Sequence, residues 1–428
     1  MERVRRRAVA AKDVVVRRHR PDYRLISYAT ILVIVGLIII FAIGPQRANQ
    51  MNESFGSSLS DSYFIVKQVI SVILSIASFF LFSYVFKFDF ILKHSTKILL
   101  VGFGASALLA LLGNVLHISS VTQCALGACR WFVVPGIGTF QPAEVLKFGV
   151  LIFLSGFLAA RIRSGLVNDK DKTLIPIAVL MAVCALFVII LQKDLGTGIA
   201  LISIVAAMLV AAGVKARVGV ILLAIVFGLG ALTIVAAPHR MARLATFIKG
   251  DEVSVDDPGG YHIAHAKIAI GSGGVLGLGI GNSVQAAGYL PEAINDSVFA
   301  ILGETFGFVG SVFILVVFYL LLRRILKVMD HLADDRYKLL AAGAFGWIAS
   351  HVIINVAAMT GLIPLTGITL PLLSFGGTSM LFVAAILGLV FQASQYTVHR
   401  SDLKKEAYED SRSGRRIRRT RYARRRSI

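Results

Sequence analysis

Long apolar runs dominate the chain, and polar residues gather in the stretches between them. Ten of these runs reach roughly the 18 residues or more that a helix needs to cross a bilayer. They cover about 25–44, 63–86, 96–114, 142–160, 174–191, 195–213, 218–237, 297–322, 338–360 and 379–397. Backbone polar groups in lipid must be paired within the segment, so the runs predict helices, and no alternation of strand period indicates a β-barrel. We predict an all-α polytopic membrane protein with ten transmembrane helices.

The composition supports this interpretation. Hydrophobic residues make up 56% of the 428 positions, and the mean hydropathy is +0.77. The first run follows a basic segment, shows no small-residue cleavage site and precedes nine more runs, so it predicts a retained helix rather than a signal peptide. We predict a basic N-terminal segment over 1–24, a membrane domain over 25–397 and a basic tail over 398–428, with no separate soluble domain.

Charge placement predicts the orientation. The net charge is +20, and alternate connecting segments hold 35 of the 44 Lys and Arg residues: 1–24, 87–97, 161–173, 214–217, 323–338 and 400–428. Because basic residues favour the cytoplasmic side, both termini are predicted to be cytoplasmic. The Arg-rich tail could suggest nucleic acid, but a segment that fixes topology and contacts anionic membrane lipids is favoured. We predict no nucleic-acid partner and leave a protein-docking role open.

Two outer segments are long, 115–141 and 238–296, and the second is a large extracytoplasmic loop between helices 7 and 8. It contains "GSGGVLGLGIGNS" (271–283), which follows no strand and has no Gly-Lys-Ser/Thr sequence of a phosphate loop, so its glycines predict turns and close backbone packing. In the first segment, Cys124 and Cys129 flank a short turn, and a disulfide and two free thiols both remain open. Cys184, inside a span, is expected to serve packing.

Acids, bases and histidines gather at the predicted outer ends of the helices. They are Glu144, Lys147, Asp194, Arg240, Arg243, His262, His265, Glu292 and Asp296, with the Gly-rich and Pro-rich stretch 361–379 beside them. Together they suit a lipid-borne anionic headgroup, because Arg and Lys bind phosphates and a carboxylate can deprotonate a hydroxyl. Ionisable residues close to the membrane core are costly, so their presence indicates a functional site.

Each candidate also has a structural alternative. Glu144 and Lys147 are three residues apart and could neutralise each other on one helix. Asp194 and Asp296 could cap the helices that follow them. Arg240 and Arg243 could bind lipid headgroups, and Glu292 could be solvated. The two histidines could have a structural role. Glu304, deeper in span eight, is expected to pair with a helix neighbour.

The chain resembles the SEDS family (FtsW, RodA, SpoVE) over about residues 25–397. The resemblance rests on six motifs in order: "RW…FQPAEVLK", "LQKDLGT", "GYHIAHAKIAIGSGG", "GNSVQ", "YLPEAINDSVFAILGETFG" and "NVAAMTGLIPLTGITLPLLSFGGTS". The sequence of the "GNSVQ" motif is more similar to the FtsW branch than to the RodA branch. The chain departs from the family pattern at Lys193, His262, His265, Ala286, Ser297, Val298 and Phe375.

The resemblance implies a peptidoglycan glycosyltransferase in the bacterial cytoplasmic membrane, active at the division septum. Its substrate would be lipid II, the undecaprenyl-pyrophosphate-linked disaccharide-pentapeptide, polymerised on the outer face. Its partners would be a class B penicillin-binding transpeptidase and other division proteins. The family's essential acid matches Asp296, and further polar positions match Glu144, Lys147, Asp194, Arg243, Glu292 and Ser374.

The expected chemistry is inverting transfer. Asp296 would deprotonate the acceptor hydroxyl, while Arg243, Lys147 and Arg240 would meet the pyrophosphate charge. No cofactor is certain, and a divalent cation (Mg²⁺ or Mn²⁺) stays open. The alternatives are a lipid II flippase, an elongation-type RodA polymerase and a membrane scaffold. A transport site belongs near the midplane, whereas this cluster is predicted at the outer surface.

Overall fold

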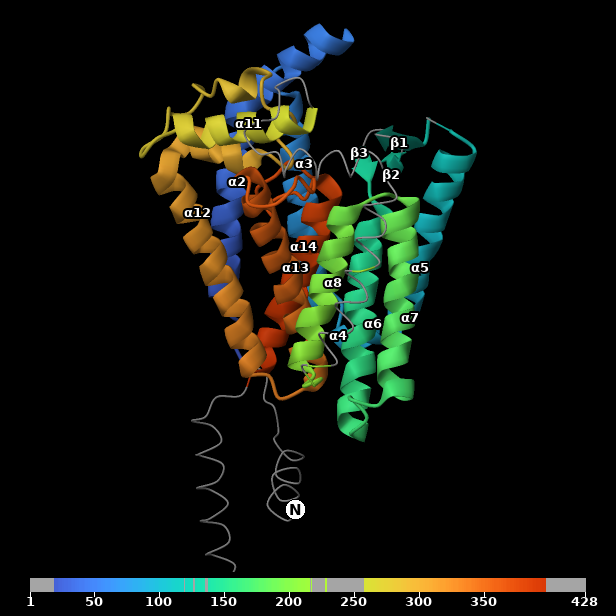
Figure 1. The fold of residues 1–428 in the computed structure, drawn as a ribbon. Helices are drawn as coiled ribbons and strands as arrows, with labels where there is room; N and C mark the ends of the chain where they lie inside the picture. Colours follow the sequence, from blue (N-terminus) through green and yellow to red (C-terminus); the bar gives the residue numbers. More distant parts are fainter. Residues whose placement is uncertain are drawn as a thin grey trace, which may run out of the picture.

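The computed structural model describes residues 19–118, 120–125, 128–134, 138–215, 217, 228 and 258–397. Its long helices run side by side (Figure 1). Their bounds are α2 Tyr23–Phe55, α3 Tyr63–Phe80, α4 Phe88–Lys93, α5 Ser95–Leu109, α6 Pro142–Ser164, α7 Ile175–Ala185, α8 Leu195–Ala211, α11 Pro258–Ser272, α12 Val298–Asp330, α13 Asp335–Met359 and α14 Gly377–Ala393.

Short π-helical and 3₁₀-helical turns extend several of these α-helices. The wider π-helical turns are η1 Leu81–Val85, η2 Ala110–Val115, η3 Lys170–Leu174 and η4 Leu186–Leu191, and the tighter 3₁₀ turns are η6 Gln285–Ala287 and η7 Ser394–Tyr396. Turns η1 and η2 continue α3 and α5, while η3 and η4 lie on either side of α7. With these turns, the helical segments at 63–85, 95–115 and 170–191 are close in length to the predicted spans.

Eight helices within the described ranges are long and apolar enough to cross a membrane, and each coincides with a predicted span. At the predicted sixth span, α8 is apolar but shorter. The predicted seventh span, 218–237, lies outside the described residues apart from position 228. Large side chains such as Phe41 and Phe308 are about two-thirds exposed, as a lipid-facing surface requires. The helical membrane fold is confirmed, and the count of ten stays a prediction.

Helix ends differ from the apolar runs. Helix α2 continues to Phe55, beyond the predicted limit of 44, and contains Pro45. Helix α12 continues to Asp330, past 322. In both cases the helix continues through a stretch that contains charged residues after the apolar run has ended. Hydropathy thus marks the part that lipid can cover, which is shorter than the helix.

The all-α expectation is wrong in one place, the segment between α5 and α6. It forms a three-stranded antiparallel sheet in the order β1-β2-β3, with strands at Thr122–Ala125, Ala128–Val134 and Gly138–Phe140. Cys124 lies opposite Cys129 in the first pairing, and a disulfide joins the two. Short strands held together by a covalent bond need no long apolar run, so hydropathy did not reveal them.

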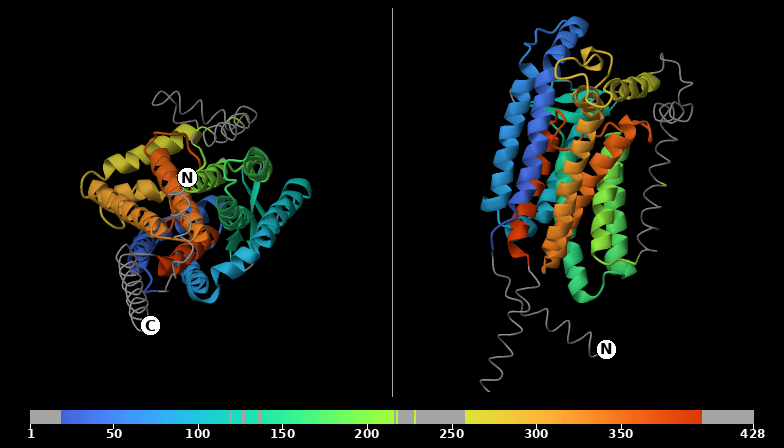
Figure 2. Two further views of the ribbon diagram at one scale, coloured as in Figure 1. Left: turned by 90° about the horizontal axis from the view of Figure 1, so that it is seen from below. Right: turned by 90° about the vertical axis from the view of Figure 1, so that its left-hand side faces the viewer.

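Helix α13 occupies the centre of the bundle and packs against α8, α12 and α6 (Figures 1 and 2). Its Trp347 is fully buried, and Cys184 on α7 is also buried, as expected for packing. The connecting segments separate to opposite ends: α4 lies at one end, and α11 and the strands lie at the other. This division agrees with the two groups of segments predicted from charge, while their sides of the membrane stay predictions.

Candidate functional site

Asp296 lies at the end of the bundle that carries α11 and the strands. It is 9% exposed and precedes α12, whose N-cap residue is Ser297. The side-chain amide of Asn355 donates a 2.6 Å hydrogen bond to the main-chain oxygen of Asp296. A Cβ placed on Gly367 would lie 3.9 Å from Asp296 Oδ2. The helix-cap alternative for Asp296 is therefore not supported, and its carboxyl lies beside the connection between α13 and α14.

That connection, residues 361–376, is held by two polar side chains of α13. Asn355 donates a second bond, 2.7 Å long, to the main-chain oxygen of Ile368. One turn earlier, His351 Nδ1 lies 3.2 Å from the main-chain oxygen of Thr369. Neither residue was among the sequence candidates. The signal was present, because two buried polar residues four apart within an apolar span call for partners.

Neighbouring segments hold the rest of the connection. The main-chain N–H of Phe375 donates to Ile294 O over 2.8 Å, which ties the connection to the turn before Asp296. The hydroxyl of Ser374 accepts from Leu370 N over 2.8 Å. A Cβ on Gly196 would approach Thr366 O to 3.0 Å, so glycine permits this contact. Ser374 thus stabilises a turn, and its predicted substrate contact stays a prediction.

Glu144 and Lys147 form the ion pair that their spacing suggested. Lys147 Nζ lies 2.8 Å from Glu144 Oε1, and the two side chains are 0% and 4% exposed. The ammonium also lies 4.5 Å from the centre of the Trp347 ring and 3.4 Å from His351 Nε2. Glu144 Oε2 has no hydrogen-bond partner among the described residues. The pair therefore faces the interior and connects α6 to α13 next to the residues that hold the connection.

Asp194 caps α8, as the structural alternative proposed. Its Oδ1 accepts from Thr197 N over 2.9 Å, and its Oδ2 accepts from the Thr197 hydroxyl over 2.8 Å and from Gln141 Nε2 over 3.1 Å. The preceding Lys193 has φ 51°, a value that proline cannot adopt. The turn thus departs from the family pattern at the position where the sequence does.

The side chain of Arg130, on strand β2, supports the turn before α8. It donates to the main-chain oxygens of Gln192 over 3.2 Å and of Lys193 over 2.8 Å. Strand β2 also carries Cys129, so the disulfide-linked sheet and the Asp194 turn are neighbours. Arg130 was not among the candidates predicted from the sequence, although it begins the "RW" part of the first motif.

The remaining candidates on the outer loop have separate surroundings. Glu292 is exposed, has φ 49° and accepts a hydrogen bond from the side chain of Asn295, which agrees with its solvated alternative. His262 Nε2 lies 2.7 Å from the Ser297 hydroxyl, whereas His265 Nδ1 lies 2.7 Å from Gln285 Oε1. The two histidines thus have different partners, as a structural role requires.

The phosphate ligands Arg240 and Arg243 and the open divalent cation stay predictions. Arg240 and Arg243 lie outside the described residues. Across the described ranges, no three or more His, Cys, Asp or Glu side chains are grouped so as to hold a metal ion. A divalent cation therefore stays a prediction, and we derive no step through one.

Helix α12 is interrupted at Gly307, which has φ 66° and ψ −163°. The Gly-rich stretch docks into this break: Leu278 N donates to Glu304 O over 2.9 Å, and Phe308 N donates to Gly274 O over 2.9 Å. A Cβ on Gly277 would lie 2.2 Å from Thr305 O. The glycines therefore serve close backbone packing, as expected.

Glu304 has partners other than the predicted helix neighbour. It is fully buried and accepts hydrogen bonds from the Ser283 hydroxyl, from Val284 N over 2.9 Å and from Gln285 N over 3.1 Å. The expectation was wrong because the Gly-rich stretch folds back onto α12 and presents backbone donors there. Glu304 thus fixes the loop that leads towards Asp296.

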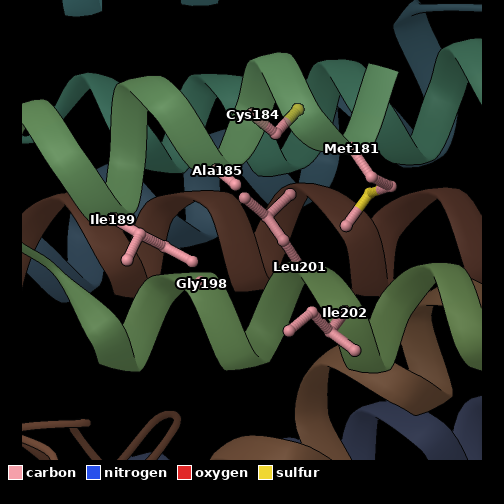
Figure 3. Close-up of a pocket in the computed structure, with 7 residues that line it drawn as sticks. All are labelled: Met181, Cys184, Ala185, Ile189, Gly198, Leu201 and Ile202. Carbon is pink, nitrogen blue, oxygen red and sulfur yellow. The ribbon is translucent and has the colours of Figure 1, made fainter. Parts of the chain in front are cut away.

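A small cavity lies away from this site, between α7, η4 and α8 (Figure 3). Its volume is about 10 Å³, and it is lined by Met181, Cys184, Ala185, Ile189, Gly198, Leu201 and Ile202. A space of this size holds about one water molecule, and its lining is apolar. It is a packing defect rather than a substrate site.

Comparisons with known proteins agree with the six motifs. The FtsW/RodA/SpoVE family model, described as "Cell cycle protein", matches residues 23–399. Stage V sporulation protein E of Bacillus subtilis (strain 168) is 30% identical over 88% of this chain and 98% of its own length. A protein named "Probable peptidoglycan glycosyltransferase FtsW" from Aliivibrio salmonicida (strain LFI1238) is 33% identical over 87% of this chain and 88% of its own.

Solved structures share the fold. One comes from a study titled "Structural coordination of polymerization and crosslinking by a peptidoglycan synthase complex", with TM-score 0.66 and 25% identity over 88% of this chain and 98% of that one. Another is the rod shape determining protein RodA of Thermus thermophilus, with TM-score 0.58 and 22% identity over 89% and 98%. On the match of its family model and of its relatives, the chain belongs to the FtsW/RodA/SpoVE family.

Proposed function

We propose that this protein is a peptidoglycan glycosyltransferase that polymerises lipid II into glycan strands on the outer face of the cytoplasmic membrane. The observation that carries the proposal is a carboxylate, Asp296, held at one end of the bundle by Asn355 and flanked by the connection between α13 and α14. Several relatives bear the name peptidoglycan glycosyltransferase, which supports the enzyme class.

Asp296 would act as the general base. Its carboxylate takes the proton from the 4-hydroxyl of the acceptor GlcNAc while that oxygen bonds to C1 of the donor sugar. The C1–oxygen bond to undecaprenyl pyrophosphate breaks, its electron pair leaves with the pyrophosphate, and the configuration at C1 inverts. Burial excludes water that would compete for the carboxylate, and the bond from Asn355 fixes the backbone that carries it.

The leaving pyrophosphate needs cations. We assign this role to Arg243 with Arg240, on the outer loop, because guanidinium groups bind phosphate in bidentate fashion. Lys147 is buried against Glu144, so its contribution is to stabilise the core behind the site rather than to meet the lipid phosphate. Glu292 is exposed near Asp296 in sequence and would contact the sugar or peptide of the substrate.

A class B penicillin-binding transpeptidase is the partner we propose, with other division proteins around it. The structural neighbour whose title names a peptidoglycan synthase complex supports a partnered enzyme. We also propose the septal, FtsW-type role on the "GNSVQ" motif, with an elongation role as the alternative. A lipid II flippase is the rival of another class. Asp296 comes just before α12 begins, at the end of the bundle that carries α11 (Figure 1), and this position disfavours a flippase because transport sites lie near the midplane.

The decisive experiment is polymerisation of purified lipid II by this chain, with and without its partner. Asp296→Asn should lower the rate by about 10²–10⁴-fold, the usual loss when a general base is removed. Asp296→Glu should also be poor, because one methylene displaces the carboxylate by roughly 1 Å. Membrane insertion should be unchanged.

Asp194→Asn is the matched control. Asp194 is a buried acid at the same end whose observed role is to cap α8, and Asn caps helices nearly as well as Asp. This variant should keep most of its activity. Full activity of Asp296→Asn would refute the assignment and make Glu292 the next candidate for the base.

A further inference from the structure

A second, larger cavity lies at the end of the bundle opposite Asp296, where three membrane-spanning segments have one of their ends. Helix α2 begins there at Tyr23, α3 and η1 end there at Val85, and α14 and η7 end there at Tyr396. The cavity is open to the surface, measures about 470 Å³ and is lined by His19, Arg20, Pro21, Tyr23, Tyr84 and Gln395. This volume lies within the range of small-ligand sites, and nothing in the proposed glycosyl transfer uses it.

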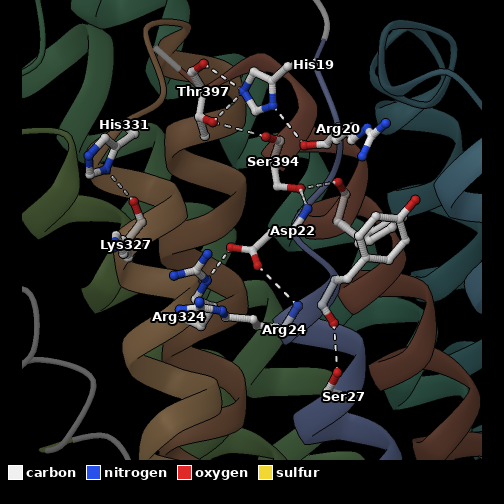
Figure 4. A network of polar contacts seen from close by, with 12 residues as sticks. His19, Arg20, Asp22, Arg24, Ser27, Arg324, Lys327, His331, Ser394 and Thr397 are labelled. Atoms are coloured by element: carbon white, nitrogen blue, oxygen red, sulfur yellow. Dashed lines mark hydrogen bonds and ion pairs between the residues drawn. The ribbon is translucent and has the colours of Figure 1, made fainter. Parts of the chain in front are cut away.

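The backbone of the lining residues 19–21 is held by a network of polar contacts (Figure 4). Asp22 N donates to the Ser394 hydroxyl over 2.9 Å, and the Asp22 carboxylate pairs with Arg324 of α12. The ring of His19 lies 2.9 Å from Thr397 O and 2.8 Å from the Thr397 hydroxyl. These contacts hold the residues on both sides of Arg20, so the position of its Cα is determined before any ligand binds.

The side chain of Arg20 supplies a charge to the lining. It is exposed, and its guanidinium points away from the network in Figure 4. Within the part of the chain that the structure describes, the guanidinium has no ion-pair partner. The nearest acid in sequence, Asp22, is paired with Arg324. An anion in the cavity would therefore meet a positive charge without competition from that carboxylate.

The rest of the lining includes two aromatic rings. Tyr23 is 58% exposed and Tyr84 is 50% exposed, and the two rings contact the buried ring of Phe391 at 5.8 and 6.0 Å between centroids. Tyrosines at the ends of membrane spans occupy the headgroup level, with the ring against apolar chains and the hydroxyl in the polar layer. Exposed Phe80 stacks on Tyr84, which extends the apolar surface from the cavity along α3.

We infer that this cavity binds the headgroup of an anionic phospholipid. Its phosphate would lie on the Arg20 guanidinium, its polar headgroup near the two tyrosine hydroxyls, and its acyl chains along the exposed face of α3. A lipid rather than a soluble anion is indicated, because the cavity opens where three spans end and its aromatic lining continues into lipid-facing side chains. The inference is independent of the chemistry at Asp296.

The test measures binding of phosphatidylglycerol and phosphatidylcholine to the purified full-length protein in detergent by native mass spectrometry. Wild type should retain phosphatidylglycerol preferentially. Arg20→Gln should weaken that binding about fivefold, as expected for the loss of one basic residue at an anionic surface. Arg20→Lys should fall between the two, because it keeps the charge and loses the planar fork.

Arg24→Gln is the matched control. Arg24 is an exposed arginine one turn along, at the same end, that does not line the cavity. It should bind phosphatidylglycerol as wild type does. Equal losses in the two Gln variants would show general surface attraction and overturn the site, as would unchanged binding in Arg20→Gln. Displacement of the lipid by inorganic phosphate alone would overturn the assignment to a phospholipid. Unchanged thermal unfolding of Arg20→Gln without added lipid should confirm that the variant folds.

Discussion

The side-chain amide of Asn355 joins the main-chain oxygen of Asp296 to that of Ile368, with hydrogen bonds of 2.6 and 2.7 Å. One buried side chain thus connects the turn that carries the proposed base to the connection beside it. Helix α13 therefore fixes the backbone on both sides of the Asp296 carboxylate, at Asp296 itself and at Ile368. Residues that fix this backbone should matter for the reaction although they touch no substrate.

Asn355→Ala should leave two buried carbonyls without their donor, which costs about 1–3 kcal/mol for an unsatisfied group. We expect a large fall in kcat with little change in KM, because the base is displaced while the substrate surface remains. Asn114→Ala is the control, since Asn114 also donates to a main-chain oxygen, that of Leu191, without contacting Asp296 or the connection between α13 and α14. Comparable activity of the two variants would contradict a positioning role for Asn355.

The buried pair of Glu144 and Lys147 predicts a non-additive result. Lys147→Met should destabilise the protein by about 3–5 kcal/mol, because it leaves a buried carboxylate without its cation. Adding Glu144→Gln should restore much of that loss, since both charges are then absent. Thermal unfolding of the single and double variants in one detergent measures this. A double variant less stable than Lys147→Met would argue against mutual neutralisation.

The break in α12 can be tested through two glycines with the same backbone angle. Gly277 and Gly281 both have φ 85°, but a Cβ at 277 would meet Thr305 O at 2.2 Å, whereas a Cβ at 281 would meet nothing within 4 Å. Both Ala variants suffer the left-handed strain of about 1–2 kcal/mol. Gly277→Ala alone should also undock the loop and speed hydrogen exchange at Phe308 and Val309. Equal exchange in both variants would contradict the docking role.

Asp334 predicts a pH dependence of stability. Burial tends to raise the pKa of its carboxyl, but hydrogen bonds from Arg336 and the nearby positive charge outweigh this and lower the pKa. A lowered folded-state pKa gives stability that is present above the unfolded pKa and lost as pH falls through the folded one. Asp334→Asn keeps the cap on α13 and removes the charge, so it should cost about 1 kcal/mol or less near neutral pH, because the group is partly exposed.

Thermal unfolding of wild type and Asp334→Asn across the acidic range measures this difference. The gap between the two proteins should narrow as pH falls below the ordinary pKa of Asp. A gap that stays constant with pH would show that the carboxylate contributes through shape or capping alone.

Apolar runs predicted the membrane spans because lipid imposes both length and composition on a spanning segment. They could not predict where α2 ends, because residues after 44 remain helical without being apolar. The sheet around Cys124 was missed for a related reason, since its strands are short and its covalent bond does part of the work of packing. The gathering of polar motifs at one end of the bundle was predicted from the sequence. Which of their side chains contact one another was not.

Within the site, the spacing of residues along the chain predicted which side chains pair. It could not predict which way a pair faces in the folded bundle. The interval from Glu144 to Lys147 indicated an ion pair, yet only tertiary packing shows that the pair faces Trp347 and His351 in the interior. Asn355 was overlooked because a polar residue inside an apolar run contributes little to a hydropathy pattern. Its importance comes from two carbonyls that lie far away in sequence, at Asp296 and Ile368.

The contact between His19 and Thr397 limits the topology of the whole membrane domain. The two residues are hydrogen-bonded, so the first and last described positions of the domain lie on one side of the membrane. A chain that leaves from and returns to the same side must cross an even number of times. Ten crossings satisfy this parity and nine do not, whichever face of the bilayer the pair occupies.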